Sequence, residues 1–138
     1  MKIKNEKSVC LIYSPDLTQL SFPDNLIIRS IFNDDLSRHL KHFFTQGEKI
    51  YSLTGHGLLV KLKESNKIRM DTLYQLIKTY QFSWINHQIH FNCGVTYTRG
   101  DINEMSTTLI FDLLSDRISL SLKNDRPEPV CLNEDTCF

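Results

Sequence analysis

The stretch KIYSLTGHGLLVKLK, residues 49–63, decides the fold of this chain. It predicts two short strands, over 49–53 and 58–63, joined by the tetrapeptide Thr54–Gly57. The two glycines of this connection supply the positive φ angles that a tight hairpin requires. Apolar residues at every second position from Leu58 share one face of the second strand. The segment therefore predicts a β-hairpin in the middle of the chain.

Helices and further strands flank this hairpin on both sides. Apolar residues three and four positions apart predict helices, and the alternation from Ile89 to Tyr97 predicts a strand. The expected helices cover about 26–44, 67–80 and 105–123, and the further strands cover 8–14, about 82–86 and 89–97. The polar tail after Arg126 is either a linker or a last edge strand around Val130. This order predicts an α/β fold, an α+β sandwich of ferredoxin-like type with a mostly antiparallel sheet flanked by helices.

The composition is typical of one globular domain. A length of 138 residues, with 41% hydrophobic and 23% charged residues, excludes disordered and collagen-like chains. Sixteen basic residues balance sixteen acidic ones, so the positive field that non-specific nucleic-acid binding needs is absent. No apolar run approaches the ~20 residues of a membrane span, and the charged N-terminus lacks the apolar segment of a secretory signal. We therefore expect a cytoplasmic location and reduced cysteines that bind no zinc.

Four segments, taken together, carry a family resemblance. They are Thr54-Gly55-His56-Gly57-Leu58, the strand Ile89–Tyr97 with its Cys-Gly-Val centre, Ser115–Arg126, and Asn33-Asp34-Asp35-Leu36. In this order they resemble the GGDEF domain, the diguanylate cyclase fold of bacterial cyclic di-GMP signalling. The five hairpin residues occupy the place of the Gly-Gly-Asp/Glu-Glu-Phe motif. The resemblance covers nearly the whole chain and implies the palm-type α+β fold of that family.

The catalytic positions of the family are changed in this chain. The resemblance implies that an active cyclase holds two divalent ions with carboxylates at the end of the first strand and at the third motif position, and places a catalytic Glu at the fourth. The counterparts here are Tyr13, His56 and Gly57. Imidazole is a poor Mg²⁺ ligand, and Thr54 replaces a glycine that lets the backbone approach the triphosphate. We expect no catalytic residue and no metal site, unless Asp16 acts as a shifted ligand.

Three residues are candidate nucleotide contacts. The resemblance implies that Asn25 and Asp34 face a guanine base and that Lys123, with Arg126 as a weaker match, contacts phosphate. From the sequence alone, Asn25 also fits a helix cap, Asp34 a solvated helix residue, and Lys123 a cation at a helix C-terminus. The inhibitory product-binding motif RxxD of the family would fall on Thr45–Glu48, where its Arg is missing. This predicts that cyclic di-GMP does not bind there.

The sequence thus predicts a degenerate, inactive GGDEF-like domain over 1–126 and a polar tail or linker over 127–138. Such a domain would regulate an attached or partner EAL-type phosphodiesterase, by docking or by binding GTP as an effector without turnover. We expect no cofactor and no nucleic-acid partner. Two alternatives stay open: an active diguanylate cyclase with displaced metal ligands, and an unrelated α/β protein-interaction domain.

Overall fold

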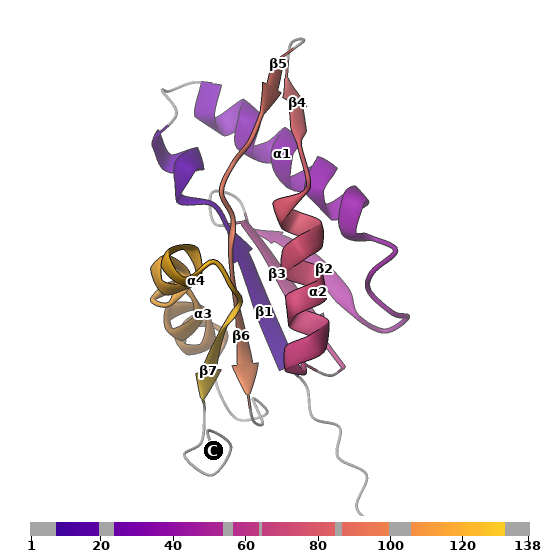
Figure 1. Ribbon diagram of the computed structural model, residues 1–138, viewed down its shortest axis with the longest axis vertical. Helices are drawn as coiled ribbons and strands as arrows, with labels where there is room; N and C mark the ends of the chain where they lie inside the picture. The colour runs from indigo at the N-terminus through magenta and orange to yellow at the C-terminus, as the bar shows by residue number, and fades with distance from the viewer. Residues whose placement is uncertain are drawn as a thin grey trace, which may run out of the picture.

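A five-stranded sheet forms the centre of the molecule (Figure 1). The computed structural model describes residues 8–19, 24–53, 57–63, 65–84, 87–99 and 106–131. The strands, in their spatial order, are β2 (Lys49–Leu53), β3 (Gly57–Leu62), β1 (Ser8–Tyr13), β6 (Gly94–Arg99) and β7 (Glu128–Cys131). Neighbouring strands are antiparallel except β6 and β7, which are parallel. The predicted mixed α/β fold with a mostly antiparallel sheet is confirmed.

Two layers of helices cover the sheet. Helices α1 (Asp24–Leu40) and α2 (Lys67–Lys78) pack on one face, and α3 (Thr107–Ser115) and α4 (Ile118–Asn124) pack on the other. A short 3-10 helix, η1 (Pro15–Gln19), follows β1. A small hairpin of β4 (Phe82–Trp84) and β5 (His87–Ile89) projects beside α1 at one end (Figure 1). No helix in the described ranges is long and apolar enough to span a bilayer.

The apolar pattern explains these two layers. Strand β1 is buried along Ser8–Ile12, because it lies at the centre of the sheet with helices on both faces. On the face of α1 and α2, the rings of Phe32, Phe82 and Phe91 pack together. On the other face, Leu11 packs in a second cluster with residues of α3, α4 and β7. The core therefore consists of two apolar clusters, one on each face of the sheet.

The predicted strand over 89–97 is wrong as a single element. Strand β5 ends at Ile89, and β6 begins at Gly94 and pairs with β1 instead of β4. The alternation persists between them because Phe91 and Cys93 are buried while Asn92 is exposed. Periodicity reports the burial of side chains and not backbone pairing, so it did not reveal the break.

The predicted helix over 105–123 is also divided. Helix α3 ends at Ser115 and α4 starts at Ile118. In a continuous helix the carbonyl of Leu114 would accept from the amide four residues on. Here it accepts from the hydroxyl of Thr96, at 2.9 Å, and from the amide of Arg117, at 3.2 Å. A buried strand hydroxyl thus takes the place of a helix hydrogen bond.

The C-terminal part of the chain contributes to the sheet. The sequence left two interpretations of the tail, a linker or an edge strand around Val130. The structure has the edge strand, because β7 follows Arg126 and pairs with β6 up to Cys131. Cys10 and Cys93 are free and buried, and burial raises the pKa of each thiol to about 12. Cys131 is disulfide-bonded, contrary to the expectation of reduced cysteines.

Candidate functional site

The end of β1 carries no carboxylate at the position expected for the first metal ligand. Tyr13 is half-buried there, and Ser14, at 1% exposure, has a hydroxyl without a partner among the described residues. The nearest carboxylate, Asp16, lies in η1 and accepts a hydrogen bond from the backbone amide of Asn92, at 2.9 Å. The shifted ligand considered from the sequence is therefore already engaged in holding η1 against the segment before β6.

The hairpin between β2 and β3 has no room for a side chain at its fourth motif position. Thr54, Gly55 and His56 lie outside the described residues, and Gly57 begins β3 with φ 87°. A Cβ on residue 57 would lie 2.1 Å from the carbonyl oxygen of Ile12 in β1. Only glycine fits this conformation and this approach. A glutamate could not be accommodated here without a shift of the backbone.

The last motif residue, Leu58, is fully buried and pairs with Ile12 of β1. Beside it, the α1 residue Asn33 is 2% exposed, and its amide nitrogen donates to Ser52 Oγ at 3.3 Å and to the Gly57 carbonyl at 3.5 Å. Its side-chain oxygen has no partner in the described part of the chain. The sequence analysis assigned no role of their own to Asn33 or Ser14, because buried polar residues on an apolar pattern look like surface residues in a sequence.

The candidate nucleotide contacts come from two layers of the molecule. Asp34 is exposed on α1, where no hydrogen bond or ion pair joins it to another described residue. Asn25 is the second residue of α1, so it lies inside the helix rather than before it. Lys123 is exposed in the last turn of α4, on the other face of the sheet. Arg126 donates from Nε to Glu128 Oε1 at 3.1 Å.

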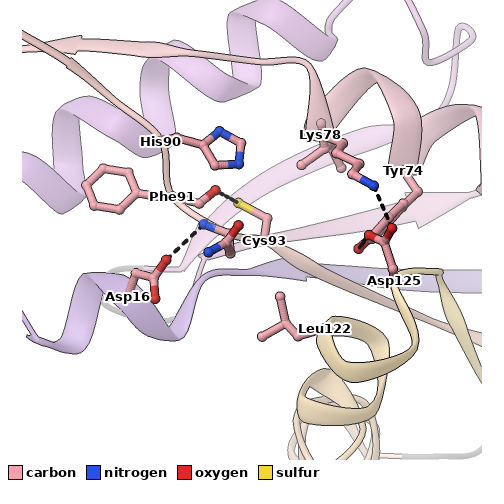
Figure 2. Close-up of a pocket in the computed structure, with 10 residues that line it drawn as sticks. Asp16, Tyr74, Lys78, His90, Phe91, Cys93, Leu122 and Asp125 are labelled. Carbon is pink, nitrogen blue, oxygen red and sulfur yellow. Dashed lines mark hydrogen bonds and ion pairs between the residues drawn. The ribbon is translucent and has the colours of Figure 1, made fainter.

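A cavity of about 380 Å³ lies between η1, α2, the segment before β6, and α4 (Figure 2). Figure 2 shows Asp125 on its wall, where it accepts from the hydroxyl of Tyr74 at 3.0 Å and pairs with Lys78 at 2.5 Å. The Lys78 ammonium and the Tyr74 hydroxyl lower the pKa of this carboxyl. Asp125 ends α4 in the left-handed conformation, with φ 52°. The two carboxylates of this cavity, Asp16 and Asp125, are thus each bound to protein groups.

Metal ligands do not cluster in the described ranges, which hold no group of three or more His, Cys, Asp or Glu side chains. Cys93 lines the cavity, but its thiol is buried and donates to the Phe91 carbonyl at 3.6 Å. A thiol with a raised pKa stays protonated at neutral pH and is a poor ligand and nucleophile. Neither metal coordination nor covalent chemistry is favoured by the side chains of this cavity.

The segment in the place of the RxxD motif forms a closed ion pair. Glu48 accepts from the amide and hydroxyl of Thr45, at 2.9 and 3.0 Å, and from the amide of Lys63, at 2.8 Å. Arg69 of α2 donates to both of its oxygens, once at 2.7 Å. The Glu48 side chain is 0% exposed. Burial alone would raise the pKa of Glu48, but the Arg69, Thr45 and Lys63 hydrogen bonds lower it from 4.5 to about 2. Glu48 therefore has no oxygen left for a ligand.

Comparisons with known proteins agree with the resemblance in the sequence. No family model matches the chain. The cyclic di-GMP phosphodiesterase PdeF of Escherichia coli K12 is 26% identical over 124 residues, which are 88% of this chain and 16% of PdeF. An EAL/GGDEF domain protein from M. capsulatus superimposes with a TM-score of 0.71 at 5% identity, over 91% of this chain and 85% of that one.

A second solved structure is the isolated GGDEF domain of TpbB (YfiN) from Pseudomonas aeruginosa. It superimposes on this chain with a TM-score of 0.62 at 7% sequence identity. The match covers 95% of this chain and 79% of the TpbB domain structure. An unrelated α/β fold is thereby excluded. At these identities the solved structures establish the fold and not the chemistry. The chain has the fold of a GGDEF domain, as the resemblance in its sequence predicted.

Proposed function

We propose that this domain is a catalytically inactive GGDEF-like module that regulates a cyclic di-GMP phosphodiesterase domain. The distant relationship to PdeF, of which the chain spans 16%, supports a place in cyclic di-GMP signalling. The observation that carries the inactivity is Gly57, where the backbone of Ile12 leaves no space for a catalytic carboxylate. The lack of a carboxylate at Tyr13 and Ser14 supports the same conclusion.

The chemistry of the cyclase explains why these changes abolish turnover. Joining two GTP molecules requires divalent ions that neutralise phosphate charge and activate the attacking hydroxyl. Mg²⁺ binds hard oxygen ligands, usually carboxylates, and dehydrates reluctantly. Tyr13, Ser14 and Gly57 offer no carboxylate, and one oxygen of Asp16 already accepts a hydrogen bond from the Asn92 amide. A triphosphate in this place would lack both its ions and its catalytic base.

GTP as an effector is the proposed mode of control. Asp34 and Asn25 on α1 would contact the guanine base, and Lys123 on α4 would contact a phosphate. GTP changes the equilibrium of a partner domain only if it binds two states of the pair with different affinities. Cyclic di-GMP is not expected at the Thr45–Glu48 segment, because the Glu48 carboxylate is saturated by protein donors.

A synthesis assay tests the inactivity. The purified chain is incubated with GTP and Mg²⁺ or Mn²⁺, and the products are separated by chromatography beside an active diguanylate cyclase. We expect no cyclic di-GMP from this chain. Accumulation of cyclic di-GMP would overturn the proposal and favour the alternative of an active cyclase with displaced ligands.

A thermal-shift titration tests GTP as the effector. Binding at a hundredfold excess over Kd stabilises the domain by about 2.7 kcal/mol. We expect Asp34→Ala to remove this stabilisation and the matched variant Asp112→Ala, at an exposed aspartate on α3, to keep it. A flat response of the parent chain would reject GTP and leave docking as the mode of control.

A further inference from the structure

A second cavity, of about 470 Å³, lies at the end of the sheet opposite Gly57. Its walls are the start of α2 at Ser65–Lys67, the end of β6 at Tyr97 and Arg99, and the segment Arg126–Pro129 that leads into β7. The volume is within the range of small-molecule sites. This cavity is separate from the end of β1 and from the proposed guanine contacts on α1.

The first turn of α2 has unpaired backbone amides, and one of them belongs to Lys67, which lines this cavity. The side chain of Asn66 caps the helix by accepting from the amide of Arg69, at 2.8 Å, and its carbonyl accepts from Met70. The amides of Lys67 and Ile68 have no partner among the described residues. The first turn contains no acidic residue. Free amides and the positive end of the helix dipole favour an anion at this place.

An independent feature, the hydroxyl of Tyr97, points to a ligand. Tyr97 lines the cavity and is 5% exposed, yet its hydroxyl makes no hydrogen bond within the described ranges. The hydroxyl oxygen itself is not sealed from solvent, so it opens into the cavity. A tyrosine of this kind is a donor available to a molecule that enters the cavity.

The charges around the cavity favour an anion as well. Glu128 accepts from Asn124, at 2.8 Å, and from Arg126 Nε, at 3.1 Å, so its charge is compensated. The terminal nitrogens of Arg126 have no partner among the described residues, and its side chain is 64% exposed. The Lys67 side chain adds a second positive charge at the rim. Asp71 is the one further carboxylate on the described wall.

We propose that this cavity binds the phosphate group of a small molecule, held by the amide of Lys67, the Arg126 guanidinium and the Tyr97 hydroxyl. A carboxylate has two oxygens, whereas phosphate offers three or four and a larger charge. The number of donors on the wall therefore matches phosphate better. The site is independent of the GTP contacts proposed above, and it stands whether or not the domain synthesises cyclic di-GMP.

The test uses inorganic phosphate as the probe and amide NMR spectra of the ¹⁵N-labelled chain, titrated at constant ionic strength against chloride. We expect saturable shifts at the amides of Lys67, Ile68 and Tyr97. Tyr97→Phe should weaken binding by about tenfold or more, the loss of one hydrogen bond to a charged group. Its melting temperature without phosphate should equal or exceed that of the parent, because the lost hydroxyl had no partner in the protein.

Two further variants locate the phosphate. Arg126→Gln should weaken binding as Tyr97→Phe does, while Lys123→Gln, which removes a positive charge from α4 outside this cavity, should leave these shifts unchanged. Phosphate shifts that vanish in Lys123→Gln, or that persist unchanged in Tyr97→Phe, would overturn the proposal. So would equal shifts with chloride, or tighter binding of acetate than of phosphate.

Discussion

The packed faces of the sheet and the end of β1 are built from the same strands. The residues of the packed faces fit a GGDEF fold, whereas those at the end of β1 differ from what the family resemblance implies. On the faces, buried apolar side chains such as Leu36, Val60 and Leu114 continue the pattern of a GGDEF fold without interruption. Tyr13 at the end of β1 and Gly57 at the start of β3 stand where the resemblance implies carboxylates. The fold depends on many interchangeable apolar contacts, and metal binding depends on a few oxygens in fixed places. The proposed loss of cyclase chemistry is therefore compatible with an intact fold.

The largest loss of stability is expected from a substitution in the apolar cluster on the sheet face covered by α1 and α2. Phe82 is 1% exposed, and its ring centroid lies 5.5 Å from that of Phe32. Phe82→Ala should lower the free energy of unfolding by about 4 kcal/mol through lost burial and a residual cavity. Ile68→Ala, at 80% exposure on α2, should change it by less than about 0.5 kcal/mol. Urea unfolding measures both, and equal effects would show that the aromatic cluster is not the core.

The next effect concerns Glu48, which lies in the segment that the sequence resemblance places at the RxxD motif. Its pKa falls from 4.5 to about 2 on folding, so the carboxylate stabilises the folded state by about 3 kcal/mol above pH 4.5. This stabilisation is lost as the pH falls through 4.5 toward 2. Glu48→Gln should be less stable than the parent at neutral pH, and the difference should shrink in acid.

Unfolding free energies measured across this pH range check the prediction. The matched variant Asp112→Asn, at an exposed carboxylate of α3, should retain the pH dependence of the parent. A difference between Glu48→Gln and the parent that stays constant down to low pH would contradict the role assigned to the Arg69–Glu48 pair.

A smaller difference in stability is expected between alanine substitutions at two glycines, one of which begins the second strand of the hairpin. Gly47 and Gly57 both have positive φ, at 93° and 87°. A Cβ on Gly47 would meet the flexible side chain of Lys63, whereas one on Gly57 would meet the backbone of Ile12. Gly57→Ala should therefore destabilise the domain by about 2 kcal/mol more than Gly47→Ala. Equal losses in chemical denaturation would show that β1 can yield, and that a carboxylate at residue 57 is sterically possible.

The sequence was sufficient for most of the scaffold. The glycine-rich connection at 54–57 predicted the hairpin, and β2 has the bounds expected from its apolar residues. The fold class was predictable because the order of helices and strands along a chain restricts the possible topologies. The observed sheet confirms it. The breaks before Gly94 and after Ser115 were missed, since both depend on contacts with distant parts of the chain, such as the hydroxyl of Thr96 on the carbonyl of Leu114.

The site was less accessible to sequence reasoning. The missing carboxylates were visible as substitutions at Tyr13, His56 and Gly57. The steric reason at Gly57 was not visible, because Ile12 is distant in sequence. The pairing of Glu48 with Arg69 links residues 21 positions apart, and no local pattern marks it. Buried polar groups such as the side-chain oxygen of Asn33 and the hydroxyl of Ser14 are revealed only by their surroundings.

The most direct test of the central claim asks whether divalent ions bind beside β1. Crystals of the chain are soaked with Mn²⁺ and a non-hydrolysable GTP analogue, and the anomalous diffraction of manganese is measured. We predict no protein-bound ion within coordination distance of Tyr13, Ser14, Asp16 or the hairpin at Gly57. Two manganese ions held there between protein oxygens and the triphosphate would contradict the account.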